Sequence, residues 1–192
     1  MNAKSSNKPT AERYHFYSEV ADEIRTGDLL AWRVNRIDSV FSFLLYIYQW
    51  LFKATYSHTA IAVRLEGELF AVEATSPAVR MMPLWMLGNF YLFRAGVPER
   101  KSNLRSLLKH LAKDYSLFDM VKNMFQFGTS DEELYCAEQC HEFYKDVGYF
   151  TSVIDEDESD IITPDKVVKK VMKQSGAVPE YIRIDKGNIH AC

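Results

Sequence analysis

The sequence has few cysteines: Cys136, Cys140 and Cys192 are the only three in 192 residues. An odd, small number in a chain of this length is not the pattern of a disulfide-stabilised secreted domain, so a reducing compartment is expected. Residues 1–10 are polar and lack the apolar segment of a signal peptide. We therefore expect a cytoplasmic protein whose first ten residues form a mobile tail.

The sequence also lacks an apolar run long enough to cross a bilayer. The longest run, Val40–Phe52, is interrupted by Ser42 and Gln49, and a transmembrane helix needs about 20 apolar residues. The expectation is a protein without a membrane span. Contact with a membrane surface through Val40–Phe52 stays open.

The sequence has no strong excess of positive or negative charge, and it has no glycine-rich loop. The chain has 23 Lys and Arg against 26 Asp and Glu, a net charge of −3, which argues against a nucleic-acid partner. The 8 glycines are scattered, so no phosphate-binding loop is present, and no Gly-x-Ser-x-Gly elbow occurs. With 47% hydrophobic residues, the composition is that of a globular protein, and the length predicts a single domain over 11–192.

Hydrophobic periodicity predicts helices and strands in an α+β order. The strands are short and joined by tight turns, which favours an antiparallel sheet or partial barrel packed against helices. The expected helices cover 11–25, 40–53, 103–115, 133–147 and 164–174. The expected strands cover 28–34, 58–65, 68–75, 79–84, 89–95 and 181–185.

Two titratable residues lie on one predicted hairpin. With the turn at Glu66 and Gly67, opposed residues have numbers that sum to about 133, which places His58 opposite position 75. Glu73 is two residues along, a diagonal of about 7–8 Å that allows a carboxylate to reach an imidazole. Taken singly, either residue is more often structural: His58 starts an apolar strand, and Glu73 fits an exposed strand face.

Cys136 is the third residue of interest. At a helix start and beside a histidine, a thiol has the lowered pKa that a nucleophile needs. However, Cys136, Cys140, Phe143 and Val147 also form a buried helical stripe. A capping box from Ser130 to Glu133 would place Cys136 inside the helix, where no unpaired backbone N–H groups would lower the pKa of its thiol. The sequence leaves both alternatives open.

Metal binding is weakly supported. Cys136, Cys140, His141 and His58 could be ligands, but Cys-x3-Cys followed directly by His does not match the usual zinc spacing. The acidic run 155–160 lacks the glycine and glutamate positions of a calcium loop and reads as a solvated segment. No metal or cofactor is therefore expected.

Several short motifs follow one another along the chain. They are Arg25-Thr-Gly-Asp-Leu-Leu30, Tyr56-Ser-His-Thr-Ala-Ile61, Val72-Glu-Ala74, Pro83-Leu-Trp85, Phe93-Arg94, Tyr135-Cys-Ala-Glu138 and Ile162-Thr-Pro-Asp165. In this order they resemble the circularly permuted NlpC-type papain-fold enzymes, in particular the YiiX-like branch. The resemblance covers about residues 26–166.

The resemblance implies a permuted papain-like fold and a cysteine hydrolase. Carried over residue by residue, Cys136 would be the nucleophile, His58 the base and Glu73 the residue that orients the imidazole. It also favours Cys136 at the helix start. Ala137 departs from the serine that the family often has at this position.

The substrate is less determined than the chemistry. Members of the permuted fold include peptidases, amidases and lipid acyltransferases, so a small peptide, amide or lipid-like substrate is expected. The aromatics of Val40–Phe52 could line an acyl-chain site or simply cover the sheet. Two alternatives stay open: a non-catalytic ligand- or lipid-binding module on the same fold, and a membrane-surface protein. The sequence does not determine the oligomeric state.

Overall fold

The computed structural model describes residues 13–33, 54–75, 78–111, 113, 136–150 and 162–185. The tail 1–10, the helix predicted over 40–53, the acidic run 155–160 and Cys192 lie outside these ranges. The strands are β1 (Arg13–Phe16), β2 (Leu29–Trp32), β3 (His58–Leu65), β4 (Glu68–Thr75), β5 (Ala78–Pro83), β6 (Phe90–Phe93) and β7 (Glu180–Arg183). The α-helices are α1 (Tyr17–Val20), α3 (Lys101–Leu108), α5 (Cys136–Asp146) and α6 (Pro164–Ser175), with 3₁₀ turns η1 (Ala21–Glu23) and η2 (Leu84–Leu87).

The described strands form one seven-stranded sheet in the order β1-β7-β6-β2-β3-β4-β5. The α+β class predicted from the sequence is confirmed. The sheet is larger than predicted, and it is not purely antiparallel, because β1 pairs with β7 in parallel. The remaining pairings in the sheet are antiparallel.

The hairpin of β3 and β4 has the predicted register. Ile61 lies opposite Val72 and Leu65 opposite Glu68, pairs whose numbers sum to 133. Glu66 and Gly67 have φ angles of 51° and 93°, and a two-residue hairpin turn with both φ values positive matches the twist of the flanking strands. This register brings the first residue of β3 near the last residues of β4.

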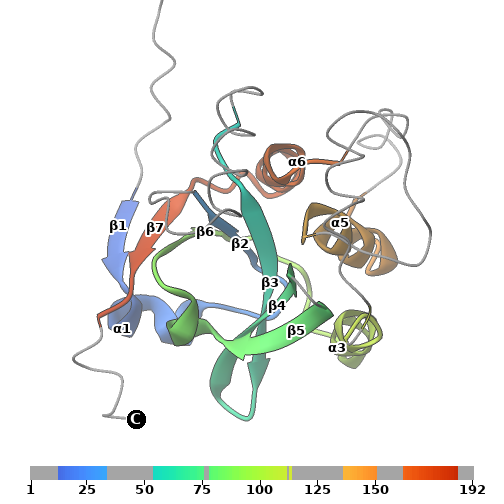
Figure 1. Ribbon diagram of the computed structural model, residues 1–192, viewed down its shortest axis with the longest axis horizontal. Coiled ribbons are helices and arrows are strands. Elements are labelled where there is room, and N and C mark those ends of the chain that lie inside the picture. The colour runs from blue at the N-terminus through green and yellow to red at the C-terminus, as the bar shows by residue number, and fades with distance from the viewer. Residues whose placement is uncertain are drawn as a thin grey trace, which may run out of the picture.

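Both faces of the sheet are covered, so its strands have apolar residues on both sides. Figure 1 shows α3, α5 and α6 together on one side of the curved sheet and α1 on the other. Alternate residues of β2 join different cores: Leu29 and Ala31 face the α5 side, and Leu30 faces the side that also holds Ile24. By the same alternation, His58 lies on the strand face of Ala60 and Glu73 on the strand face of Ala71, and both of these alanines belong to the second side.

The helix predicted over 11–25 is wrong in its first part. Residues 13–16 form strand β1, and only the short helix α1 and the turn η1 follow. Tyr14 and Tyr17 do have helical spacing, but the parallel pairing with β7, some 165 residues away in sequence, outweighs this local preference. The backbone N–H of Phe16 donates to the Glu19 carboxylate over 2.9 Å, which marks the change from strand to helix.

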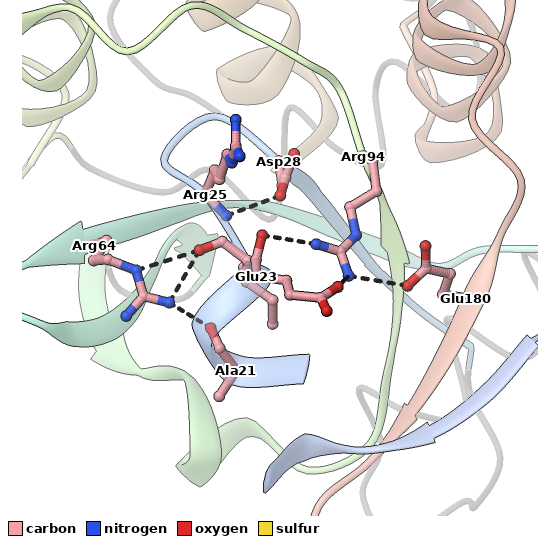
Figure 2. Close-up of polar contacts among 8 residues, drawn as sticks. Ala21, Glu23, Arg25, Asp28, Arg64, Arg94 and Glu180 are labelled. Carbon is pink, nitrogen blue, oxygen red and sulfur yellow. Dashed lines mark hydrogen bonds and ion pairs between the residues drawn. The ribbon is translucent and has the colours of Figure 1, made fainter. Parts of the chain in front are cut away.

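Two arginines hold the segment after α1 against the sheet (Figure 2). Arg64 of β3 donates to the carbonyls of Ala21 and Ile24, and Arg94, just after β6, donates to the carbonyl of Glu23 over 2.7 Å. The carbonyl of Ala21 also accepts the backbone N–H of Ile24 over 3.3 Å, so Arg64 gives it a second donor. Backbone carbonyls at a helix end need partners from outside the helix, and the two guanidinium groups supply donors to Glu23 and Ile24 where the chain enters β2.

Candidate active site

Cys136, His58 and Glu73, which lie far apart in sequence, are in contact in the structure. Nε2 of His58 lies 2.8 Å from Oε2 of Glu73, across the β3–β4 hairpin. On its other side, the His58 side chain hydrogen-bonds to the thiol of Cys136, the first residue of α5.

A fourth residue, Arg80, completes this chain of contacts. Its Nε and Nη2 lie 2.9 and 2.7 Å from Oε1 of Glu73, so the carboxylate contacts His58 with one oxygen and Arg80 with the other. Arg80 lies directly opposite Glu73 in the β4–β5 pairing. The sequence reasoning missed Arg80, although the break at Ser76 and Pro77 could have been used to derive this second hairpin register.

Burial and charge act in opposite directions on these groups. Burial disfavours the charged imidazole, but the neighbouring Cys136 thiolate and Glu73 carboxylate raise the pKa of His58 to about 10. Burial likewise opposes ionisation of Cys136, and the imidazolium of His58 nevertheless lowers the thiol pKa. Glu73 is buried too, yet His58 and Arg80 lower its pKa. The favoured state is a thiolate–imidazolium pair beside an ionised carboxylate.

The backbone around Cys136 also favours the thiolate. Hydrogen bonds from the backbone at Thr59 and Ala137 lower the thiol pKa. Ala137 is the second residue of α5, and in the first turn of a helix the N–H groups have no partner within the helix. Ser130 and Glu133, which would form the alternative capping box, lie outside the described residues.

Three further residues hold the elements of the site together. The buried amide of Gln139 donates to the carbonyl of Val72 over 3.3 Å, which joins α5 to β4 next to Glu73. The carboxylate of Asp165, in the first turn of α6, accepts the backbone N–H of Thr55 over 2.7 Å, just before β3. The ring of Trp32 lies 5.4 Å from that of His58.

Cys140 and His141, weighed above as metal ligands, are buried residues of α5. Burial raises the pKa of the Cys140 thiol, the opposite direction to Cys136 one turn earlier. The ring of His141 lies 5.5 Å from that of Phe150. Within the described ranges, no group of three or more His, Cys, Asp or Glu residues is placed to hold a metal ion.

A cavity of about 440 Å³ lies near the start of β2, whereas His58 pairs with Trp32 at the end of that strand. Its lining residues are mostly charged: Asp22, Glu23, Arg25, Asp28, Arg94 and Gly96. Arg94 is already paired with Glu23 and Glu180 (Figure 2), and Asp28 accepts the backbone N–H groups of Arg25 and Ala95. These contacts are internal to the fold, and none of Cys136, His58 and Glu73 lines this cavity.

Comparison with known proteins finds likeness among solved structures. No protein-family model matches the chain, and no curated protein is significantly similar to it. Among solved structures, the chain is similar to one described as the metalloprotein yiiX from Escherichia coli, with a TM-score of 0.49 and 20% identity over 83% of this chain and 88% of that chain. At these values the likeness transfers no activity and no residue role to this chain.

The described residues contain no helix that combines the length and the apolar character required to span a membrane. The Val40–Phe52 segment, for which contact with a membrane surface was left open, lies outside those residues, so that question is not tested.

Proposed function

We propose that this protein is a thiol hydrolase or acyltransferase of the permuted papain-like type. Cys136 is the nucleophile, His58 the general base and acid, and Glu73 the residue that orients the imidazole. The observation that carries the proposal is the continuous set of contacts from the Cys136 thiol through His58 to Glu73. A nucleophile, a base within hydrogen-bond reach and a third group that orients the base form the general arrangement of covalent catalysis.

The chemistry is acyl transfer. The thiolate of Cys136 attacks the carbonyl carbon of the substrate, which forms a C–S bond and moves an electron pair onto the carbonyl oxygen. Collapse of this intermediate breaks the bond to the leaving group, which takes the proton from His58 and departs. An acceptor then loses a proton to His58, attacks the thioester and releases Cys136. Water as acceptor makes the protein a hydrolase, and an amine or alcohol makes it an acyltransferase.

The start of α5 is also suited to the negative charge that develops on the carbonyl oxygen. Backbone N–H groups at a helix N-terminus stabilise anions, and the N–H of Cys136 itself is the proposed donor to this oxygen. Because the donor is backbone, alanine at position 137, where the family often has serine, leaves the donor in place. The departure noted in the sequence therefore does not remove this part of the mechanism.

The proposed substrate is a small peptide, amide or lipid-like acyl compound. The side chain of His58 is 23% exposed, so the acid–base group can be reached from solvent beside a buried thiol. A net charge of −3 keeps nucleic acid outside the proposal. Because the nucleophile must be a free thiol, a reducing compartment suits the proposal, and Cys136 and Cys140 are both free.

The test is the pH dependence of alkylation at each cysteine, measured by iodoacetamide labelling and mass spectrometry. We expect Cys136 to label with a midpoint well below the free-thiol pKa of about 8.5. The His58→Ala variant should raise that midpoint, because the imidazolium no longer stabilises the thiolate. Cys140, buried on the same helix without a histidine contact, is the internal control and should label far more slowly.

The competing function is a non-catalytic binding module on the same fold. It predicts that Cys136 reacts no faster than Cys140 at any pH and that His58→Ala changes nothing. That result would contradict the proposed enzyme. With a reactive Cys136 in hand, screening of peptide, amide and ester substrates follows, and Cys136→Ala should abolish any turnover found.

A further inference from the structure

We infer that Arg80 is a positioning residue of this site, which holds Glu73 in place and balances its charge so that the ionised Cys136–His58 pair is tolerated. The inference rests on the proposed function and adds a residue to it. It is carried by the contacts of Arg80 with Glu73 and by the place of both residues in the sheet.

The geometry assigns one carboxylate oxygen to each neighbour. Oε2 of Glu73 contacts His58 at 2.8 Å, and Oε1 contacts Nε and Nη2 of Arg80 at 2.9 and 2.7 Å. The Glu73 carboxylate therefore cannot rotate about its last bond without losing a partner. Two N–H groups of the rigid, planar guanidinium of Arg80 converge on one oxygen, which leaves the other oxygen for His58.

The position of Arg80 in the fold explains how it can reach a buried acid. β5 is one of the two edge strands of the described sheet, and Arg80 lies directly opposite Glu73 across the pairing with β4. The side chain of Glu73 is 5% exposed, whereas that of Arg80 is 46% exposed. The guanidinium thus remains largely hydrated while its inner edge binds the buried carboxylate.

Charge counting gives the functional consequence. Along the contacts from Cys136 through His58 and Glu73 to Arg80, the ionised state has two negative and two positive groups. Without Arg80, the same state carries one uncompensated negative charge in a largely buried place, which is costly. The system would relieve that cost by keeping the thiol protonated. Arg80 therefore favours the thiolate although it does not contact sulfur.

A purely structural ion pair makes a different prediction. If the pair were only structural, its loss would lower the stability of the fold without changing the acidity of a thiol on another element. The thiol pKa separates the two roles, because β5 and α5 contribute opposite ends of the contact chain.

The experiment measures the pKa of Cys136 from the ultraviolet absorbance of its thiolate, with the Cys136→Ser variant as baseline. We expect Arg80→Met and Arg80→Gln each to raise this pKa by roughly 0.5–1 unit, the size expected for a charge acting through a partly solvated path. Arg80→Lys, which keeps the charge, should recover at least half of the shift. Arg183→Met, which removes an exposed arginine from β7, is the matched control and should leave the pKa unchanged.

A double-mutant cycle with Glu73→Gln tests whether Arg80 acts through Glu73. In the Glu73→Gln background, where no carboxylate charge remains to be balanced, Arg80→Met should raise the thiol pKa by less than half of its effect in the parent. A low thiol pKa in the parent that stays unchanged in both neutral Arg80 variants would overturn the inference and leave the proposed function standing. An ordinary thiol pKa in the parent would overturn the proposed function itself, and the inference with it.

Discussion

Glu73 shows at the scale of a single residue how an unpromising position becomes part of a site. In sequence it interrupts an apolar strand, a place where an exposed face is the usual explanation. In the structure it is buried, and its two oxygens bind an imidazole and a guanidinium. A buried carboxylate with two cationic partners stays ionised, which is the state that an orienting residue must have.

Glu73→Gln should lower the pKa of His58 from its raised value of about 10, because the neutral amide no longer stabilises the imidazolium. In this variant the imidazolium of His58 should lose its proton at a lower pH than in the parent. Side-chain NMR of labelled histidine, followed against pH, measures it directly. Glu68→Gln, which neutralises an exposed glutamate on the same strand, is the control. A His58 titration that is identical in both variants would show that Glu73 does not act on the imidazole.

The two cysteines of α5 make the same point by contrast. Cys136 and Cys140 are one helical turn apart and both buried, yet the thiol pKa is lowered at the first and raised at the second. The difference comes from the His58 imidazole and from the backbone N–H groups at the start of the helix. Cys136 contacts both, whereas Cys140 lies one turn further along the helix. A buried helical stripe and a thiol with a lowered pKa are thus compatible on one helix.

At the scale of elements, the site is assembled from a hairpin and two helix starts. The β3–β4 hairpin brings His58 to Glu73, α5 brings Cys136 to His58, and α6 fixes the chain before β3 through Asp165. The side chain of Thr163 caps α6 by accepting the N–H of Lys166 over 3.3 Å. The hydrogen bonds at the ends of these elements therefore help to place the side chains of the candidate site.

Asp165→Ala should destabilise the fold by about 1–3 kcal/mol, because it leaves the backbone N–H groups of Thr55 and Tyr56 without their acceptor. It should also speed amide hydrogen exchange at the start of β3 more than at its end. Urea unfolding and exchange mass spectrometry measure the two effects. Asp165→Asn, which keeps an oxygen acceptor, is the matched variant and should lose less. Unchanged exchange at His58 and Thr59 would show that α6 does not hold this end of the strand.

At the scale of the whole molecule, the sheet is covered on both faces, and the helical side also buries a histidine that the site does not use. His110, in the turn after α3, is 5% exposed, and neither of its ring nitrogens has a hydrogen-bond partner among the residues that the structure describes. Burial lowers its pKa to about 4, and the charges of Lys109 and Lys113 act in the same direction, whereas Asp146 acts in the opposite direction. The folded state therefore keeps His110 neutral.

This makes stability depend on pH with a defined sign. An unfolded histidine has a pKa of about 6.5, so below that value the unfolded state binds a proton that folded His110 binds only near pH 4. The contribution of neutral His110 is fully present above the unfolded pKa and is lost as the pH falls from about 6.5 towards 4. Urea unfolding across this window should show the loss in the parent and a smaller loss in His110→Leu. Equal slopes in the two proteins would contradict the assignment.

Much of the fold could be predicted from local pattern. Strands 58–65 and 68–75, their turn and their register agree with the structure, because alternation and a Glu-Gly turn are local signals. The helix beginning at Pro164 agrees as well. The segment 11–25 could not be predicted, because β1 exists only through its pairing with β7, near the other end of the described chain. The parallel pair was missed for the same reason.

The sequence by itself determined the hairpin that places His58 beside Glu73, since register follows from turn position and the two-residue period of a strand. It also determined that Cys136 and Cys140 share a helix. Only the tertiary structure decided which thiol meets the imidazole, because that depends on how α5 packs against β3. The tertiary structure alone also gave Glu73 its second partner, because Arg80 reaches the carboxylate through the pairing of β4 with β5. The charge of Arg80 acts strongly on this carboxylate because burial reduces the screening by water.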